Sequence, residues 1–414
     1  MRTIILSLGM AVMPAAYASQ LYIGQDTCPL NSLSLMIGPP KICPSVNIIS
    51  SYNTTQDRDG LSQRRIAADM ESDVWKTLRS CSAKYCIYTN KNFYGEAISV
   101  ITTAHDRGRI GKIRAPEAIS KSDRELAKVV EIPGKGRGLV ATRTIRRGER
   151  IMASRPAFLV HRDIFREVAL EDIYSLVDTA VNSLPTSRKD AYLAQAGTMG
   201  GHKALDILFT NAFQISLGEH DGFHYANFPE VSILNHDCRP NLAFFIDKSL
   251  THYTHAVRDI KPGEELTISY LDALQVRSVR QERVQHLLGF SCSCPQCALP
   301  KKESDASDRR LFAISQMRDK LSDLQSKGTS LAVIEEYVAL YRTERLEHRI
   351  AEAYKLAALG YNTLKAEGMA KTYALLSLEA ALLESGPEAA DVKEMKNLAN
   401  APKSHWSWSL KSHD

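Results

Sequence analysis

The sequence predicts an α+β protein in which a β-rich domain over residues 129–272 precedes an α-helical domain over residues 303–400. Two observations predict this division. The first region contains short runs of β-branched and aromatic residues bounded by glycine turns. From residue 303 onward Ala, Leu, Glu and Lys dominate, and apolar residues recur at helical spacing, as at Leu311, Ile314 and Leu321.

Composition excludes several classes of protein. The 414 residues are 44% hydrophobic and 24% charged, with a net charge of +5, which is ordinary for a globular protein of two or three domains. The charge is too small for this length to indicate nucleic-acid binding, so no direct nucleic-acid contact is expected. No apolar run approaches the roughly 20 residues of a membrane span, so no transmembrane segment is expected. We expect a monomer.

The start of the chain resembles a secretory signal. Residues 1–18 contain an early arginine, a short apolar core and a small-residue cleavage pattern, although a buried strand or helix is the alternative. Residues 19–128 are expected to be partly irregular. Short β-like runs at 85–88 and 97–101 predict a small β layer ahead of the main domain, and residues 116–128 predict a charged helix or linker.

The eight cysteines form two groups. The early group comprises Cys28, Cys43, Cys81 and Cys86, an even number that allows two disulfides in three pairings. The late group comprises Cys238 and a C-x-C-x-x-C cluster made of Cys292, Cys294 and Cys297. Three clustered cysteines leave a tetrahedral site one ligand short, and Cys238 can supply the fourth, so the spacing predicts one structural zinc. The alternative for the cluster is a disulfide within 292–297, which its short spacings would strain.

The β-rich domain begins with a glycine turn. Residues 129–132 and 139–142 read as strands, and the segment P-G-K-G-R-G at 133–138 connects them. No helix follows these glycines, so a dinucleotide-binding fold is rejected. The stretch 141–149 is echoed at 256–264, and each stretch ends in a glycine turn that is expected to connect two strands.

The middle of the chain carries the polar motif N-H-D-C-R-P-N at 235–241 between two hydrophobic runs. Residues 162–206 are helical in pattern, and 208–217 returns to strand character. A strand over 266–270 ends on Tyr270. The segment 273–300 then contains a helix with a basic face, over 275–288, and the cysteine cluster.

Four motifs stand in a fixed order: the glycine turn, N-H-x-C-x-P-N, G-E-E-L-T-I-S-Y and C-x-C-x-x-C. Together they resemble the SET-domain protein lysine methyltransferases over residues 129–298. The resemblance is greatest to the SET-and-MYND type, which also has a helical C-terminal domain. No finger cysteines lie between the glycine turn and Asn211, so the MYND finger is absent, and the chain is similar to finger-less fungal SET proteins. The resemblance implies a knotted-loop active site and a post-SET zinc cluster.

The resemblance also implies the cofactor, S-adenosylmethionine (SAM), and the residues that hold it. Tyr270 would be the catalytic tyrosine. Many relatives carry a channel tyrosine at the position of Leu288, so the number of methyl groups transferred is open here. The residues implied to contact the cofactor are Lys135, Arg137, Asn211, Ser232, Asn235, His236, Tyr270 and Phe290.

The expected activity is transfer of methyl groups from SAM to the ε-amine of a protein lysine, in a histone or a non-histone substrate. One alternative is a catalytically silent SET fold that acts as an interaction scaffold. Another is a secreted disulfide protein that inherited the fold. The signal-like start favours the secretory route, whereas SAM and zinc thiolates favour the cytoplasm or nucleus, where disulfides are rare. The sequence leaves the compartment open.

Overall fold

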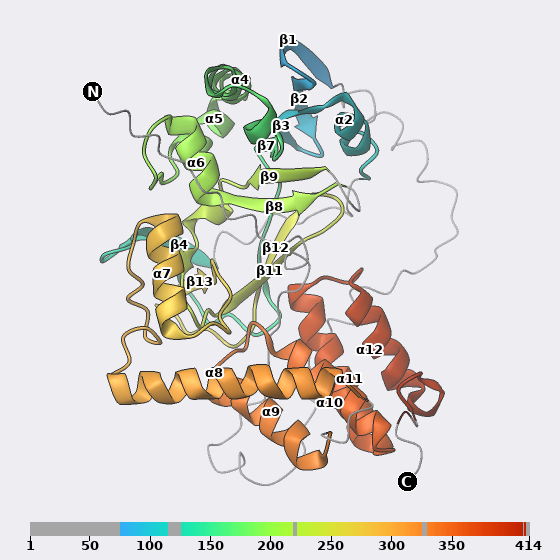
Figure 1. The fold of residues 1–414 in the computed structure, drawn as a ribbon. Coiled ribbons are helices and arrows are strands. Elements are labelled where there is room, and N and C mark those ends of the chain that lie inside the picture. The colour runs from blue at the N-terminus through green and yellow to red at the C-terminus, as the bar shows by residue number, and fades with distance from the viewer. Residues whose placement is uncertain (1–74, 115–125, 218–221, 325–328, 409, 411–414) are drawn as a thin grey trace, which may run out of the picture.

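The computed structural model describes residues 75–114, 126–217, 222–324, 329–408 and 410. The signal-like residues 1–18 lie outside these ranges, as do Cys28 and Cys43. In Figure 1 a β-rich region with helices on its flank occupies one side of the molecule, and five helices pack together beneath it. The two regions are in contact through α11, which packs against β11 and β12.

The largest sheet has six strands in the order β1-β2-β3-β7-β9-β8. The first three strands form an antiparallel meander, β3 pairs in parallel with β7, and the remaining pairs are antiparallel. The strands span β1 Lys76–Ser82, β2 Tyr85–Phe93, β3 Glu96–Thr103, β7 Phe158–His161, β9 Phe223–Asn227 and β8 Ala212–Ser216.

This sheet corrects the expectation of a separate β layer before residue 129. Val100 on β3 lies beside Leu159 on β7, and both side chains are fully buried. The early strands therefore share a core with the strands at 158–227, and a domain boundary at residue 129 would divide the sheet. Strand runs were visible in the sequence, but pairing between strands so far apart leaves no local signal.

Helices α3 to α6 cover one face of the six-stranded sheet, whereas Ile110 of α2 packs in the core that contains Val100 and Leu159. Helices α3 to α6 contribute a core that contains Ile173, Val177 and Leu208, packed against Phe158 and Ile101 of the strands. The helices span α2 Ala104–Ile110, α3 Ile164–Glu167, α4 Leu170–Asn182, α5 Thr186–Leu193 and α6 Lys203–Asn211.

The predicted return to strand character at 208 is wrong by four residues. Helix α6 continues to Asn211, and β8 begins at Ala212. Leu205 and Leu208 are both buried on the core face of α6. Packing of this helical stripe outweighs the β preference of the following residues.

Two smaller sheets carry the sequence motifs. One has the order β10-β13-β5-β4 and the other β11-β12-β6. Their strands span β4 Ala127–Ile132, β5 Gly136–Ala141, β6 Arg150–Ser154, β10 Asn235–His236, β11 Leu242–Ile246, β12 His252–Ala256 and β13 Glu265–Ile268.

The two similar stretches at 141–149 and 256–264 lie against each other. Ile145 and Ile260 form an antiparallel bridge in which each backbone N–H donates to the other's carbonyl. Their turns use Gly148 and Gly263 at φ values of 86° and 87°, a left-handed conformation that favours glycine. The expected strand-connecting turns are therefore present.

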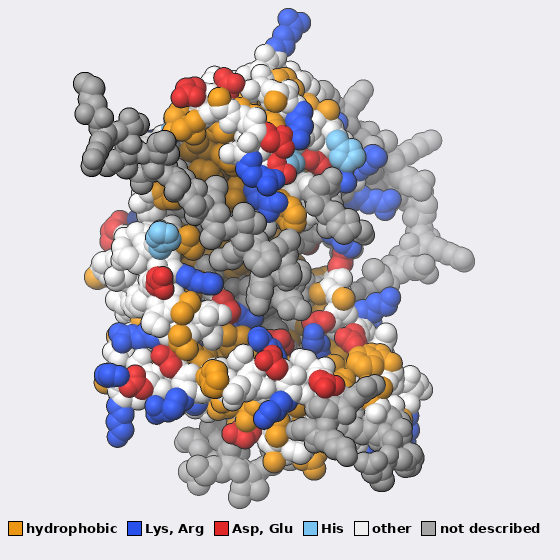
Figure 2. All heavy atoms as spheres, viewed as in Figure 1, with side chains coloured by type: hydrophobic (Ala, Val, Ile, Leu, Met, Phe, Trp, Pro, Cys, Tyr) orange, Lys and Arg blue, Asp and Glu red, His pale blue; other side chains and the backbone are white. Residues whose placement is uncertain are grey.

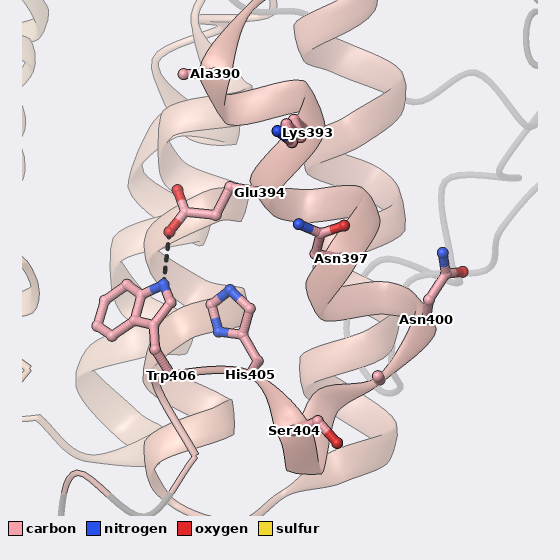
Figure 3. A pocket seen from close by; sticks show the side chains of 9 residues that line it. Ala390, Lys393, Glu394, Asn397, Asn400, Ser404, His405 and Trp406 are labelled. Atoms are coloured by element: carbon pink, nitrogen blue, oxygen red, sulfur yellow. Dashed lines mark hydrogen bonds between the residues drawn. The ribbon is translucent and has the colours of Figure 1, made fainter.

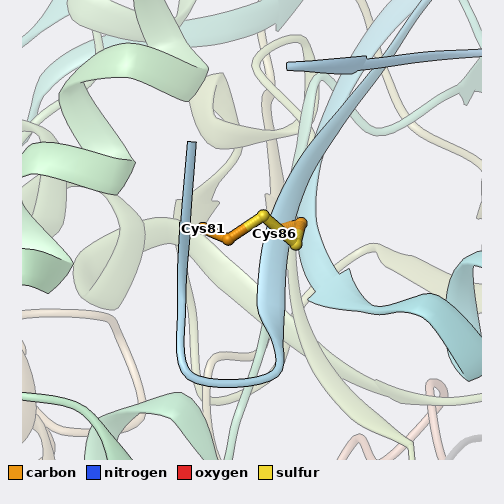
Figure 4. Close-up of a disulfide and its surroundings, with 2 residues drawn as sticks. All are labelled: Cys81 and Cys86. Atoms are coloured by element: carbon orange, nitrogen blue, oxygen red, sulfur yellow. A yellow bond between two sulfur atoms is a disulfide. The ribbon is translucent and has the colours of Figure 1, made fainter. Parts of the chain in front are cut away.

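A disulfide joins Cys81 on β1 to Cys86 on β2, across the hairpin (Figure 4). This bond belongs to one of the three pairings open in the sequence; Cys28 and Cys43, the other two cysteines of that pairing, lie outside the described residues. Because the hairpin turn already brings the two strands together, the bond closes a loop only five residues long. It therefore contributes less loop-closure entropy than a long-range disulfide would.

The C-terminal helices bury a core rich in tyrosine and small residues, including Tyr341, Tyr354, Ala358 and Ala374. Within the described residues, no helix combines the length and apolar content required to cross a bilayer. The helices span α8 Lys301–Ser322, α9 Leu331–Thr343, α10 Ile350–Thr363, α11 Glu367–Glu384 and α12 Ala390–Asn400.

A buried carboxyl at the end of α11 predicts a pH-dependent stability. Both Glu384 oxygens are buried and lack a hydrogen-bond partner among the described residues. Burial raises the pKa of Glu384 well above its usual value, and Arg349 and Arg147 offset this only in part. The native state therefore keeps a proton that the unfolded chain releases, so this group favours unfolding increasingly as pH rises above about 4.3.

Glu384→Gln should therefore raise the unfolding temperature at pH 8 and change it little near pH 4.5. Thermal denaturation at both pH values measures this, with Glu388→Gln, an exposed carboxylate paired with Lys248, as the control. A Gln variant that is less stable than the wild type at pH 8 would show that the carboxylate is ionised and stabilising.

Candidate active site and metal centre

The glycine turn between β4 and β5 places a lysine against an acidic side chain of β13. Gly134 and Gly136 have φ values of 75° and 70°, which glycine adopts without the steric cost of a side chain. Lys135 lies between them, and its Nζ is 2.6 Å from Oε2 of Glu265. The turn therefore directs one cation toward the motif that contains Tyr270.

Gly138 allows the closest approach in the site. A Cβ atom at this position would lie 2.7 Å from Nδ2 of Asn235 and 2.7 Å from Cγ1 of Ile132. The Asn235 amide uses the open space to donate to the carbonyl of Arg137 at 3.2 Å and to Oε1 of Glu265 at 2.9 Å. Glu265 therefore links the glycine turn to the Asn-His motif, a role that sequence analysis missed.

Gly138→Ala should displace the Asn235 amide and weaken SAM binding by about tenfold or more, since one methyl group here meets two tight contacts. Isothermal titration calorimetry with SAM measures the effect. Gly95→Ala is an informative control, because a Cβ there meets nothing within 4 Å, although its φ of 95° adds backbone strain. Equal SAM affinity of Gly138→Ala and wild type would contradict a role of the Asn235 amide in SAM binding.

The motif at 235–241 runs beside the motif at 265–270. Strand β10 pairs in parallel with β13, so that Asn235 lies opposite Thr267 and His236 opposite Ile268. The Asn241 side chain forms two hydrogen bonds with the backbone of β13. Its amide donates to the carbonyl of Glu265, and its oxygen accepts from the N–H of Thr267. Two motifs about thirty residues apart are thereby fixed side by side.

Tyr270 and His236 are in direct contact. The Tyr270 N–H donates to Nδ1 of His236 at 3.1 Å, and the Tyr270 hydroxyl donates to the carbonyl of Leu234 at 2.6 Å. The residue is 41% exposed, but its hydroxyl points inward, and burial raises the hydroxyl pKa. At neutral pH the tyrosine is therefore a neutral hydrogen-bonding group and not a base.

His236 is neutral as well. Burial lowers its pKa to about 4. Because Nδ1 accepts a backbone hydrogen bond, the ring proton resides on Nε2, which lies 3.4 Å from Sγ of Cys238. The imidazole thus connects Tyr270 to the cysteine cluster.

Phe290 is a partly exposed aromatic residue near His236. Helix α7 spans Arg277–Leu288 and ends at Gly289, whose φ of 72° turns the chain out of the helix. The Phe290 ring is 37% exposed, and its centroid is 6.5 Å from that of His236. An exposed aromatic face beside a polar cluster suits stacking on a planar ligand.

Three other predicted cofactor residues have local partners. The Arg137 guanidinium donates to the carbonyl of Ala194, the Asn211 amide to that of Ala196, and the Ser232 hydroxyl to that of Pro229. Arg137 and Asn211 both hold the segment 194–200. Their contact with a cofactor stays a prediction.

Asp206 also supports this segment, and sequence analysis missed it. Its carboxylate accepts hydrogen bonds from the backbone N–H groups of Thr198, Met199 and Gly200. Thr198 in turn lies close to Gly289, just before Phe290. The segment 194–200 therefore lies next to the residue that precedes Phe290.

The four late cysteines converge beneath the Asn-His motif. Their sulfur atoms all lie within 4.8 Å of one another, all four residues are buried, and none is in a disulfide. Sγ of Cys238 is 3.6 Å from Sγ of Cys297. In a tetrahedral site with Zn–S bonds near 2.3 Å the sulfurs are about 3.8 Å apart, so the arrangement fits zinc.

A buried arginine complements the cluster. Arg280 on α7 is 1% exposed, and its Nε lies 3.3 Å from Sγ of Cys238. This guanidinium would partly balance the negative charge of zinc-bound thiolates, a role that the spacing of the cysteines does not predict.

A cavity lies away from these residues, in the helical region. A cavity of about 690 Å³ is lined by α12 and the segment after it, and its labelled residues include Lys393, Asn397 and Trp406 (Figure 3). It contains none of the predicted site residues. On the face shown in Figure 2, Lys and Arg side chains alternate with Asp and Glu and form no continuous basic surface.

Part of this chain matches a known protein family. Residues 136–271 match the family model described as SET domain, and the chain is homologous to named protein lysine methyltransferases. It is 26% identical over 291 residues to the histone-lysine N-methyltransferase set5 of Schizosaccharomyces pombe, covering 68% of this chain and 86% of that protein.

The chain is also similar to methyltransferases of the SMYD type. Identity to human N-lysine methyltransferase SMYD2 is 31% over 138 residues, covering 32% of this chain and 31% of that protein. Identity to human histone-lysine N-methyltransferase SMYD3 is 36% over 103 residues, covering 25% of this chain and 24% of that protein. These alignments span a quarter to a third of the SMYD relatives, and no finding points to a MYND finger in this chain.

Proposed function

We propose that this protein is a SAM-dependent methyltransferase that acts on the ε-amine of lysine in proteins. The observation that carries the proposal is the direct contact of Tyr270 with His236, beside Asn235, in a chain that contains a SET domain. The SET domain and the named relatives support the reaction class. Histone and non-histone lysines are both open as substrates.

The residues of this chain fit the cofactor. S-adenosylmethionine supplies an electrophilic methyl group on a sulfonium. Lys135 has the charge to attract the cofactor's carboxylate, and the Phe290 face suits its adenine. Asn235 and His236 offer polar groups between these two ends. Arg137, Asn211 and Ser232 complete the set that the resemblance implies.

Tyr270 positions the substrate amine in this mechanism. Its hydroxyl hydrogen is used by the carbonyl of Leu234, so the hydroxyl oxygen is left to accept a hydrogen bond from an amine. Its raised pKa prevents it from acting as a base near pH 7. Since releasing a proton from a lysine of pKa about 10.4 at pH 7 costs roughly 4–5 kcal/mol, the site must favour the neutral amine by excluding water.

The cysteine cluster would hold one structural zinc through Cys238, Cys292, Cys294 and Cys297. Four thiolate ligands leave no open coordination position, so the metal would take no part in the chemistry. Its role would be to tie the segment that carries Phe290 to the Asn-His motif.

Transfer of labelled methyl from SAM to a protein and peptide array, with the full chain, tests the activity. Label that appears on lysine, and is lost when the acceptor is arginine, supports the proposal. SAM binding without transfer to any acceptor, or no SAM binding at all, would favour the alternative of a silent scaffold. The product masses also report the methylation degree, which Leu288 leaves open.

A further inference from the structure

The residue after the first zinc ligand is a buried arginine that reaches the helical region. Arg239 is 7% exposed. Its Nη1 donates to the carbonyls of Cys238 and Ala273, its Nε donates to the carbonyl of Glu344, and its Nη2 lies 2.8 Å from Oε2 of Glu344. The Asn-His motif is thereby attached to the end of α9.

Glu344 is the centre of a buried polar network. Its side chain is 1% exposed, yet it accepts hydrogen bonds from three residues. Besides Arg239, the Ser307 hydroxyl donates to Oε2 at 2.7 Å and the Arg310 Nε to Oε1 at 2.6 Å, both from α8. Its pKa is accordingly lowered despite burial, so the carboxylate is charged.

The C-x-C-x-x-C segment of the cysteine cluster is hydrogen-bonded to the same network. Gln296 lies between Cys294 and Cys297 and is buried. Its amide donates to the Ser307 hydroxyl at 2.8 Å, and Arg345 donates to its oxygen. A continuous chain of hydrogen bonds therefore runs from Gln296 through Ser307 to Glu344 and on to Arg239.

We propose that Glu344 is a positioning residue for the zinc and cofactor site. One carboxylate of the helical region holds both chain segments that carry the cysteines, 238–239 on one side and 294–297 on the other. It thereby sets the spacing of the four sulfurs and the place of Phe290. The helical region is the outer support of the cofactor site. The zinc part of this inference stands on the cysteine geometry alone, and the cofactor part rests on the proposed function.

Glu344→Gln tests the proposal, because it keeps the shape of the side chain and removes the charge that Arg239 and Arg310 require. In the zinc-loaded full chain, we expect zinc transfer to a chromophoric chelator at least tenfold faster than in wild type, the range seen when partners of metal ligands are lost. SAM affinity should fall about tenfold, whereas kcat at saturating SAM should change little.

Two further variants separate positioning from general stability. Ser307→Ala cuts the link to Gln296 but leaves the Arg239–Glu344 pair, so it should speed zinc release and increase hydrogen exchange at 292–298 even if Glu344→Gln fails to fold. Glu352→Gln is the matched control, since its carboxylate accepts from Tyr341 inside the helical region. We expect it to release zinc at the wild-type rate.

Wild-type zinc release in both Glu344→Gln and Ser307→Ala would overturn the proposal, as would equal acceleration in Glu352→Gln. Zinc release and hydrogen exchange need no methyl transfer. A wild-type protein that binds no SAM would therefore refute the proposed function while the role of Glu344 at the zinc site is still measured.

Discussion

Tyr270→Phe should reduce single-turnover methyl transfer by about 10²-fold or more, while SAM affinity stays within a few-fold of wild type. The phenyl ring preserves packing against His236, and the backbone N–H of residue 270 still donates to Nδ1 of His236. Only the hydroxyl is lost, and with it the oxygen that would orient the amine. A change in the methylation degree would have the same cause, since the hydroxyl lines the path of the methyl group.

Tyr192→Phe is the control for this experiment. Its hydroxyl also donates to a backbone carbonyl, that of Ala204, but from the buried face of α5. This variant should lose some thermal stability and no activity. An unchanged transfer rate and product for Tyr270→Phe would remove Tyr270 from the mechanism.

Cys294→Ser should eliminate zinc binding and, with it, measurable SAM affinity and transfer, while the six-stranded sheet stays folded. A serine hydroxyl does not replace a thiolate ligand, and the three remaining sulfurs leave an incomplete site. The segment that carries Phe290 then loses its attachment to Cys238. Zinc content by mass spectrometry, SAM calorimetry and far-ultraviolet circular dichroism together measure the effect.

Cys81→Ser is the matched control, because it removes a cysteine from the β1–β2 hairpin, outside the cluster. Its zinc content and SAM affinity should equal those of wild type. Active Cys294→Ser protein that contains no zinc, or unchanged SAM affinity after zinc removal from the wild type, would contradict the structural role of the cluster.

The parts of the site that follow from sequence are those whose chemistry is tied to spacing. The spacing of the cysteines at 292, 294 and 297 predicts a metal site. The order of the motifs predicts that Asn235, His236 and Tyr270 belong to one active site. The structure places His236 and Tyr270 in contact and gathers the four sulfurs. The α+β division was also predictable, because helical periodicity and glycine-bounded strands are local signals.

The supporting residues could not be predicted in this way. Arg280 and Glu344 are ordinary charged residues in sequence, and each acquires its role only through a partner brought close by the tertiary fold. The same holds for β1–β3, whose strand character was visible but whose place in the large sheet depends on a pairing with β7.

These long-range pairings also determine when the protein can complete its folding. The three-stranded meander can form once residues 76–103 have been synthesised. Its strand β3 has no partner at the outer edge until residues 158–161 of β7 have been made. The Asn-His motif is completed later still, because Arg239 can form its buried ion pair only after Glu344 has been synthesised. Contacts of such sequence separation slow folding and leave unpaired edges exposed. Nascent chains that stop between residues 300 and 340 should therefore remain bound to chaperones, and release should begin once α9 has left the ribosome.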